Sequence, residues 1–211
     1  MKKQQLILIS IVAAICGCIA DVLLLYSSEG NYHTGDLNFF NEISLSRITW
    51  GYFIGILLIP FELLGLGVVG DELYPAQSRK RKIFQFILEY LFILGLIYHG
   101  IISIMGIVKK EASNGDYVIG LCNALHDPLV FVLGIGFVLL TCGIVLPVWR
   151  KETSLPKSII LFNPIVTYAF ILAIYFLFPM VGNYLMVAGF NFSILVFLLA
   201  ALFLMRECEN A

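Results

Sequence analysis

Apolar stretches of about 20 residues recur along this chain and are separated by short polar connections. That length matches the hydrocarbon core of a bilayer, which a helix crosses in roughly 20 residues. Hydrophobic residues make up 60% of the 211 positions, charged residues make up 13%, and the mean hydropathy is +0.96, whereas about a quarter of a soluble domain is charged. The pattern predicts about six membrane spans, near residues 5–26, 47–70, 83–107, 117–148, 158–178 and 180–205.

These spans are expected to be α-helices. In lipid, each backbone amide and carbonyl needs a partner within its own segment, and the period-2 alternation typical of a transmembrane barrel is absent. The spans leave no stretch for a soluble domain, so residues 1–211 are predicted to form a single all-α domain, a polytopic transmembrane helix bundle. The sequence has no internal repeat, so a transporter built from inverted repeats has no support.

The basic residues predict the direction of the spans, because cytoplasmic loops carry an excess of Lys and Arg. With the N-terminus inside, ten of them lie on the cytoplasmic side and three outside: Lys2, Lys3, Arg79, Lys80, Arg81, Lys82, Arg150, Lys151, Lys157 and Arg206, against Arg47, Lys109 and Lys110. Both termini are therefore predicted to be cytoplasmic, in a bacterial-type cytoplasmic membrane with membrane lipids as neighbours. The net charge of -1 does not favour binding to nucleic acid.

The first apolar run imitates a secretory signal, since Lys2 and Lys3 precede it. It continues to Tyr26 and is long enough to span, and Cys16 follows Ile15 rather than the small residue that lipidation needs. We interpret the run as an uncleaved first helix. The five cysteines lie mostly inside apolar segments, so no disulfide framework is expected.

Ionisable residues inside the spans are the functional candidates, because a charge in hydrocarbon is costly and must face protein or water. At ~1.5 Å per residue, Asp21 lies roughly 8 Å and His99 roughly 12 Å from the outer ends of their spans. If the fourth span is helical from Tyr117, its polar residues reach a similar depth. The residues that share this depth predict a polar pocket in the outer half of the bundle: Asp21, His99, Ser103, Cys122, His126 and Asp127.

Imidazole and carboxylate groups in one pocket suit a zinc site, with Asp21, His99 and His126 as the metal ligands. Zinc lowers the pKa of a bound water to about 7, which suits hydrolysis of a lipid amide or ester. Intramembrane hydrolases of the alkaline ceramidase group use three histidines, an aspartate and a serine, but their spaced motifs are not matched, and the third histidine, His33, is in a loop. Two membrane histidines at similar depth also suit a haem.

Simpler roles are open to some of these residues. Asp127 precedes Pro128, and an aspartate N-cap followed by proline is a common helix start. The fourth helix would then begin at Pro128, and residues 117–126 would lie near water. Asp21 and His99 can pair with each other as a structural contact or as part of a working site.

A second group of polar residues is expected in the inner half of the bundle. Glu62 lies too deep to reach the interface easily, so it must be protonated, hydrogen-bonded or exposed to a water-filled pocket. Glu89 lies closer to its span end and can reach the interface. Asn163 and Asn191 carry amides that can bridge helices or contribute to a pocket.

Small residues and prolines shape the predicted packing. Gly51 and Gly55 have the small-xxx-small spacing that lets helices approach closely. Pro60 and Pro164 fall inside predicted spans and should kink them. Together they favour a compact bundle with freed backbone carbonyls.

Several short motifs resemble those of an uncharacterised family of bacterial six-helix integral membrane proteins, a domain of unknown function. They extend over nearly the whole chain: Ala20-Asp21, Leu24-Leu25-Tyr26, Leu45-Ser46-Arg47 with Gly51 and Pro60, Tyr98-His99, Asn163-Pro164, and Gly189-Phe190-Asn191. The resemblance implies no activity, and it marks these polar positions for testing.

Three functions of different classes follow as hypotheses. The leading one is binding or transport of a small amphiphile or lipid, because deep carboxylates and kinked helices suit a cavity without a complete catalytic set. The second is an enzyme, either a zinc-dependent lipid hydrolase or an acid/base isomerase using Glu62 or the His/Asp set, which requires at least three of these residues to converge. The third is a structural or interaction subunit, whose polar residues only specify helix pairing.

Overall fold

The computed structural model of the protein describes residues 2–28, 37–75, 77–111 and 115–210, without the side chains of 115–116 and 206–210. His33, in the predicted outer loop, lies outside the described residues. Within these residues the fold is all-α, with eight α-helices and three short 3-10 helices. The predicted fold class is confirmed at this level.

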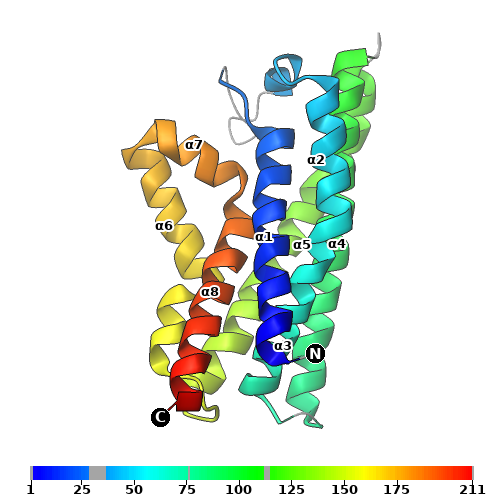
Figure 1. The fold of residues 1–211 in the computed structure, drawn as a ribbon. Helices are drawn as coiled ribbons and strands as arrows, with labels where there is room; N and C mark the ends of the chain where they lie inside the picture. Colours follow the sequence, from blue (N-terminus) through cyan, green and yellow to red (C-terminus); the bar gives the residue numbers. More distant parts are fainter. Residues whose placement is uncertain (1, 29–36, 76, 112–114, 211) are drawn as a thin grey trace.

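Four apolar helices form the main body of the bundle and stand side by side in Figure 1. They are α1 (Lys3–Leu25), the Leu45–Leu73 segment, α4 (Arg79–Glu111) and α5 (Gly115–Trp149). Each is long and apolar enough to cross a membrane. They correspond to the first four predicted spans.

The Leu45–Leu73 segment is interrupted at Pro60, as predicted. It consists of α2 (Leu45–Leu58), the 3-10 helix η3 (Ile59–Phe61) and α3 (Glu62–Leu73). Proline has no backbone N–H to continue the helical ladder. The hydroxyl of Ser10 on α1 donates to Phe61 O at 2.7 Å and accepts from Gly65 N at 2.6 Å. Ser10 thus inserts between an i, i+4 backbone pair beside the break.

The last two predicted spans differ from the prediction. The range 158–178 contains the 3-10 helix η4 (Lys157–Phe162) and the 14-residue α6 (Pro164–Leu177). The range 180–205 is divided between α7 (Pro179–Val187) and α8 (Gly189–Asn210), which are bent by 83°. If the bent pair counts as one span, five segments are long and apolar enough to cross a membrane.

Proline and asparagine explain how α6 begins. Pro164 occupies the first turn of the helix instead of its interior, so the predicted kink there is wrong. Asn163 precedes it as the N-cap, and its side-chain oxygen accepts from Ile165 N at 2.9 Å. A proline at the first position is tolerated because the first amides of a helix have no intrahelical partner.

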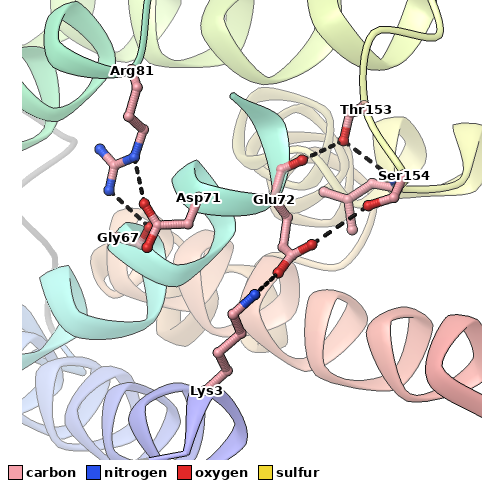
Figure 2. Close-up of polar contacts among 8 residues, drawn as sticks. Lys3, Gly67, Asp71, Glu72, Arg81, Thr153 and Ser154 are labelled. Atoms are coloured by element: carbon pink, nitrogen blue, oxygen red, sulfur yellow. Dashed lines mark hydrogen bonds and ion pairs between the residues drawn. The ribbon is translucent and has the colours of Figure 1, made fainter. Parts of the chain in front are cut away.

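The two termini lie at the same end of the bundle in Figure 1, which we call the terminal end. Figure 2 shows a polar cluster at this end, where the Glu72 carboxylate pairs with Lys3. Ser154 Oγ donates to Glu72 Oε2 at 3.5 Å, and Thr153 Oγ1 donates to Glu72 O at 2.7 Å. These contacts join α1, α3 and the segment after α5.

Arg47 stabilises the opposite end of α1. Its Nη2 donates to Val22 O at 3.0 Å and to Tyr26 O at 2.9 Å. The last carbonyls of a helix lack intrahelical donors and favour a cation. This contact gives one of the few predicted outer basic residues a structural role.

Two apolar cores lie on either side of a polar layer. The first core contains Ile11 of α1 and Leu91 of α4, and the second contains Leu24 and Ile102 of the same two helices. Between these positions the chain places polar residues on both helices, including Asp21 and His99. The polar layer is therefore enclosed along the bundle axis by apolar packing.

Candidate ligand-binding cavity

A cavity of about 150 Å³ lies within this polar layer. Its walls come from α1, η3, α3, α4, α5, α6, α7 and α8, and most of its lining is apolar. Four of the predicted site residues line it: Asp21, Glu62, His99 and Asn191. An apolar cavity of similar size accepts a molecule as large as benzene.

Asp21 and Asn191 join the first and last helices at the cavity. Asn191 Nδ2 donates to Asp21 Oδ2 at 2.7 Å. Gly17, one turn before Asp21 on α1, makes room for this amide, because a Cβ there would lie 2.8 Å from Asn191 Cγ. The predicted helix-bridging role of Asn191 is confirmed.

His99 is held by the glycine face of α2. Its Nε2 lies 3.1 Å from Gly51 O, and since a carbonyl only accepts, Nε2 carries the proton. Gly55 provides the space for the ring, because a Cβ there would lie 2.2 Å from His99 Nε2. The Gly51 and Gly55 spacing thus serves a polar contact as well as close helix approach.

The other ring nitrogen of His99 faces Asp21. The distance from His99 Nδ1 to Asp21 Oδ1 is 3.7 Å, which is longer than a hydrogen bond. With Nε2 protonated, a neutral imidazole would present an acceptor at Nδ1 to a carboxylate, which also only accepts. One proton must therefore reside on this pair, on Nδ1 or on the carboxyl, for the contact to be favourable.

Glu62 is the least satisfied residue of the cavity. It is fully buried, at 0% exposure, and neither carboxylate oxygen has a hydrogen-bond partner among the described residues. A carboxylate removed from water without a partner is very costly. The sequence placed Glu62 in a separate inner-half group, but the structure places it in the same cavity as Asp21 and His99.

Packed aromatic rings form part of the cavity wall. Phe190 of α8 meets Phe137 of α5 edge to face at 4.9 Å between ring centroids, and Tyr168 of α6 at 5.3 Å. All three residues line the cavity. Sequence reasoning did not identify Phe137 and Tyr168, because an aromatic in an apolar span has no distinguishing signal.

The model of a family of unknown function, DUF6796, matches residues 1–208. The chain belongs to this family. Neither a curated protein nor a solved structure matches the chain. The expected resemblance to a family of unknown function is thus confirmed, and the family assigns no activity. Several motifs behind that resemblance contribute to the cavity, including Asp21, Tyr98-His99 and Phe190-Asn191.

Two other predicted residues are buried outside the cavity lining. Ser103 donates its hydroxyl to His99 O, one turn back on the same helix, at 2.8 Å. Asn163 accepts from Thr141 Oγ1 of α5 at 3.2 Å in addition to capping α6. Asn163 therefore bridges helices, as predicted.

His126 and Asp127 pair with each other, and neither lines the cavity. His126 Nδ1 lies 2.8 Å from Asp127 Oδ1, and the Asp127 side chain is 79% exposed. The alternative in which Asp127 caps a helix starting at Pro128 is wrong, because α5 runs from Gly115 with Pro128 inside it. The pocket role predicted for Asp127 is also wrong, since the carboxylate points out of the protein interior.

The predicted zinc set does not assemble. In the part of the chain that the structure describes, no three His, Cys, Asp or Glu side chains are grouped to hold a metal ion. His99 lines the cavity, whereas His126 packs against Tyr98 at 5.4 Å between ring centroids and is not part of the lining. Cys122, predicted at the same depth as His126, is also absent from the lining. A metal bound jointly by Asp21, His99 and His126 is therefore not supported, nor is a haem between the two histidines.

Proposed function

We propose that this member of DUF6796 is a multi-pass protein of a bacterial-type cytoplasmic membrane that binds a small amphiphile, or one end of a lipid, in its central cavity. The observation that carries the proposal is a partly open, mainly apolar cavity with four polar residues from α1, α3, α4 and α8. Ligand sites in proteins combine apolar walls with a few convergent polar groups in this way.

The cavity volume limits what is bound. At about 150 Å³ it holds a group the size of a benzene ring, so a whole phospholipid does not fit inside. The ligand is a small amphiphile, or a lipid that inserts one end and leaves its remainder outside. The cavity therefore suits a small ligand or a partly inserted lipid, and not a bilayer lipid that is held entirely inside it.

The proposed topology has six crossings and both termini in the cytoplasm. It counts α6, with η4, as the fifth passage and the bent α7–α8 pair as the sixth. An even number of crossings agrees with two termini at the same end (Figure 1). The positive-inside rule places the terminal end in the cytoplasm, because the Arg79–Lys82 run begins α4 there. Reporter fusions after residues 75, 112 and 152 test this orientation: only the fusion after 112 should report an external location.

An acid/base isomerase is the second candidate, because Asp21, His99 and Glu62 line one cavity. General acid/base chemistry needs such groups within hydrogen-bond reach of a substrate. In this case the ligand recovered from the protein would be converted on incubation, whereas a binding protein returns it unchanged.

A pair of glycines on α4 provides the test of binding. A Cβ at Gly95 or at Gly100 meets no atom within 4 Å, but only Gly95 lines the cavity. Gly95→Leu should therefore fill the cavity, and Gly100→Leu is its matched control. Both variants, and the unmodified chain, would be purified in mild detergent and analysed for bound small molecules by native mass spectrometry.

The expected result is a ligand retained by the unmodified chain and by Gly100→Leu, and lost from Gly95→Leu. Equal ligand content in all three proteins would show that the cavity is not the binding site. Complete absence of a ligand, with no difference in thermal stability on adding host lipid extract, would favour the structural or interaction subunit.

A further inference from the structure

The acidic side chains that line the cavity outnumber the basic ones. Among the described residues of the lining, the ionisable side chains are Asp21, Glu62, His99, Tyr98 and Tyr168, and there is no Lys or Arg. Two carboxyl groups therefore face one imidazole. The lining therefore has more acidic than basic side chains.

The Asp21 carboxyl already has a hydrogen-bond donor and a proton that balances its charge. Asn191 Nδ2 donates to it at 2.7 Å, and the proton required between Asp21 and His99 neutralises one charge of that pair. His99 in turn donates to Gly51 O. The imidazole is thus held by α2 and directed at Asp21, and is not free to serve the second carboxyl.

Glu62 has no such hydrogen-bond donor among the described residues. Its oxygens have no partner among the described residues, and its side chain is fully buried in the cavity wall. Buried charges in proteins are paired or bind a cation. In the free protein a proton can neutralise this carboxyl, and a cation supplied from outside the chain can take the place of that proton.

The wall around the cavity favours a particular kind of cation. Phe190, Phe137 and Tyr168 present packed aromatic rings to the cavity. Aromatic faces attract organic ammonium groups, and the interaction strengthens when water is excluded. A strongly hydrated inorganic ion would instead lose its water shell in a mainly apolar space.

We propose that the ligand of this cavity carries a cationic amine at its buried end, paired with the Glu62 carboxylate and flanked by the aromatic wall at Phe190. This inference rests on the proposed binding function and specifies its ligand class. A protonated amine supplies the hydrogen-bond donors and the positive charge that Glu62 lacks, and the about 150 Å³ cavity admits an ammonium group with a ring or a few methylenes.

The test compares three compounds of nearly equal size: benzylamine, which is cationic at neutral pH, benzyl alcohol, which is neutral, and benzoate, which is anionic. Binding to the full chain in lipid nanodiscs would be measured by isothermal titration. The Gly95→Leu protein gives the background from partition into lipid. We expect benzylamine to bind at least tenfold more tightly than benzyl alcohol, and benzoate not to bind.

Glu62→Gln keeps the side-chain shape and removes the charge. It should lose the preference for benzylamine, at least tenfold in affinity, while its affinity for benzyl alcohol stays the same. Glu89→Gln is the matched control, because Glu89 is an exposed carboxylate that accepts from Gln85 on α4 and does not line the cavity. If Glu62→Gln does not fold, the order of the three compounds on the unmodified chain decides.

The failures of the two proposals are distinguishable. Equal binding of amine and alcohol that Gly95→Leu abolishes would overturn the amine inference and leave the binding function intact. The same holds if Glu62→Gln keeps the full preference for the amine. No binding above the Gly95→Leu background for any compound would overturn both proposals.

Discussion

The acidic residues at the terminal end and Glu62 in the cavity have opposite surroundings. At the terminal end, Glu72 pairs with Lys3 and Asp71 pairs with Arg81 at 2.8 Å (Figure 2). In the cavity, Glu62 has no partner among the described residues. The chain thus pairs its acids where water already lowers the cost of a charge, and leaves one unpaired where that cost is highest.

This difference separates what holds the fold from what can bind a ligand. Pairs open to solvent contribute little to stability, about 0–1 kcal/mol each, and the Asp71 side chain is 49% exposed. The terminal cluster therefore mainly joins segments and sets their register. An unsatisfied buried group lowers the stability of the free protein, and its presence in a cavity is the basis of the binding proposal made above.

The largest expected effect is at the glycine that accommodates His99. Gly55→Ala places a Cβ 2.2 Å from His99 Nε2 and forces the ring away from Gly51 O. The free energy of unfolding should fall by about 3 kcal/mol, the upper range for overpacking. Gly100→Ala, where a Cβ meets nothing within 4 Å, should change little. Thermal unfolding in detergent measures both, and similar midpoints would mean that His99 is not fixed by α2.

Glu62→Leu is the direct test of the comparison. Removing an unpartnered buried carboxyl should raise the free energy of unfolding by about 1–3 kcal/mol, measured without added ligand. Glu72→Leu, which breaks the contacts with Lys3 and Ser154, should lower it by at most about 1 kcal/mol. A large loss of stability in Glu62→Leu would show that Glu62 is satisfied in the folded protein and that the two regions do not differ.

Ser10→Ala examines the helix break that precedes Glu62. The variant removes the hydroxyl between Phe61 O and Gly65 N, and a stability loss of about 1 kcal/mol is expected, the usual net value of a hydrogen bond. Ser103→Ala is the control, because the Ser103 hydroxyl only donates a hydrogen bond to His99 O within its own helix. Chemical unfolding monitored by tryptophan fluorescence separates the two, and equal effects would argue against a stabilising role for Ser10.

The smallest effect concerns the pH response of the terminal end. The Lys80 ammonium, which donates to Glu152 Oε2 at 2.9 Å, lowers the pKa of Glu152 below its usual 4.5. The resulting stabilisation is present above that value and is lost as the pH falls through the lowered pKa. Glu152→Gln should therefore show a slightly smaller drop in melting temperature between pH 6 and pH 3 than the unmodified chain. An unchanged drop would mean that the pair contributes nothing.

Several site residues were predictable because a helix rises by a fixed length per residue, so counting residues from a span end gives the depth of a side chain in the membrane. Asp21 and His99 were expected at similar depths, and they lie 3.7 Å apart. Asn191 was expected to bridge helices and donates to Asp21. Counting failed for His126, because depth says nothing about the direction in which a side chain leaves its helix. His126 packs against Tyr98 and lies outside the cavity lining.

The sequence by itself determined that the chain is helical and apolar, and it located the first four long helices, since hydrocarbon length and backbone hydrogen bonding permit little else. Only the tertiary structure decided that α7 and α8 bend by 83° and that Glu62 shares a cavity with Asp21 and His99. Such outcomes depend on how helices rotate and cross, and those angles are set by contacts between residues far apart in the sequence.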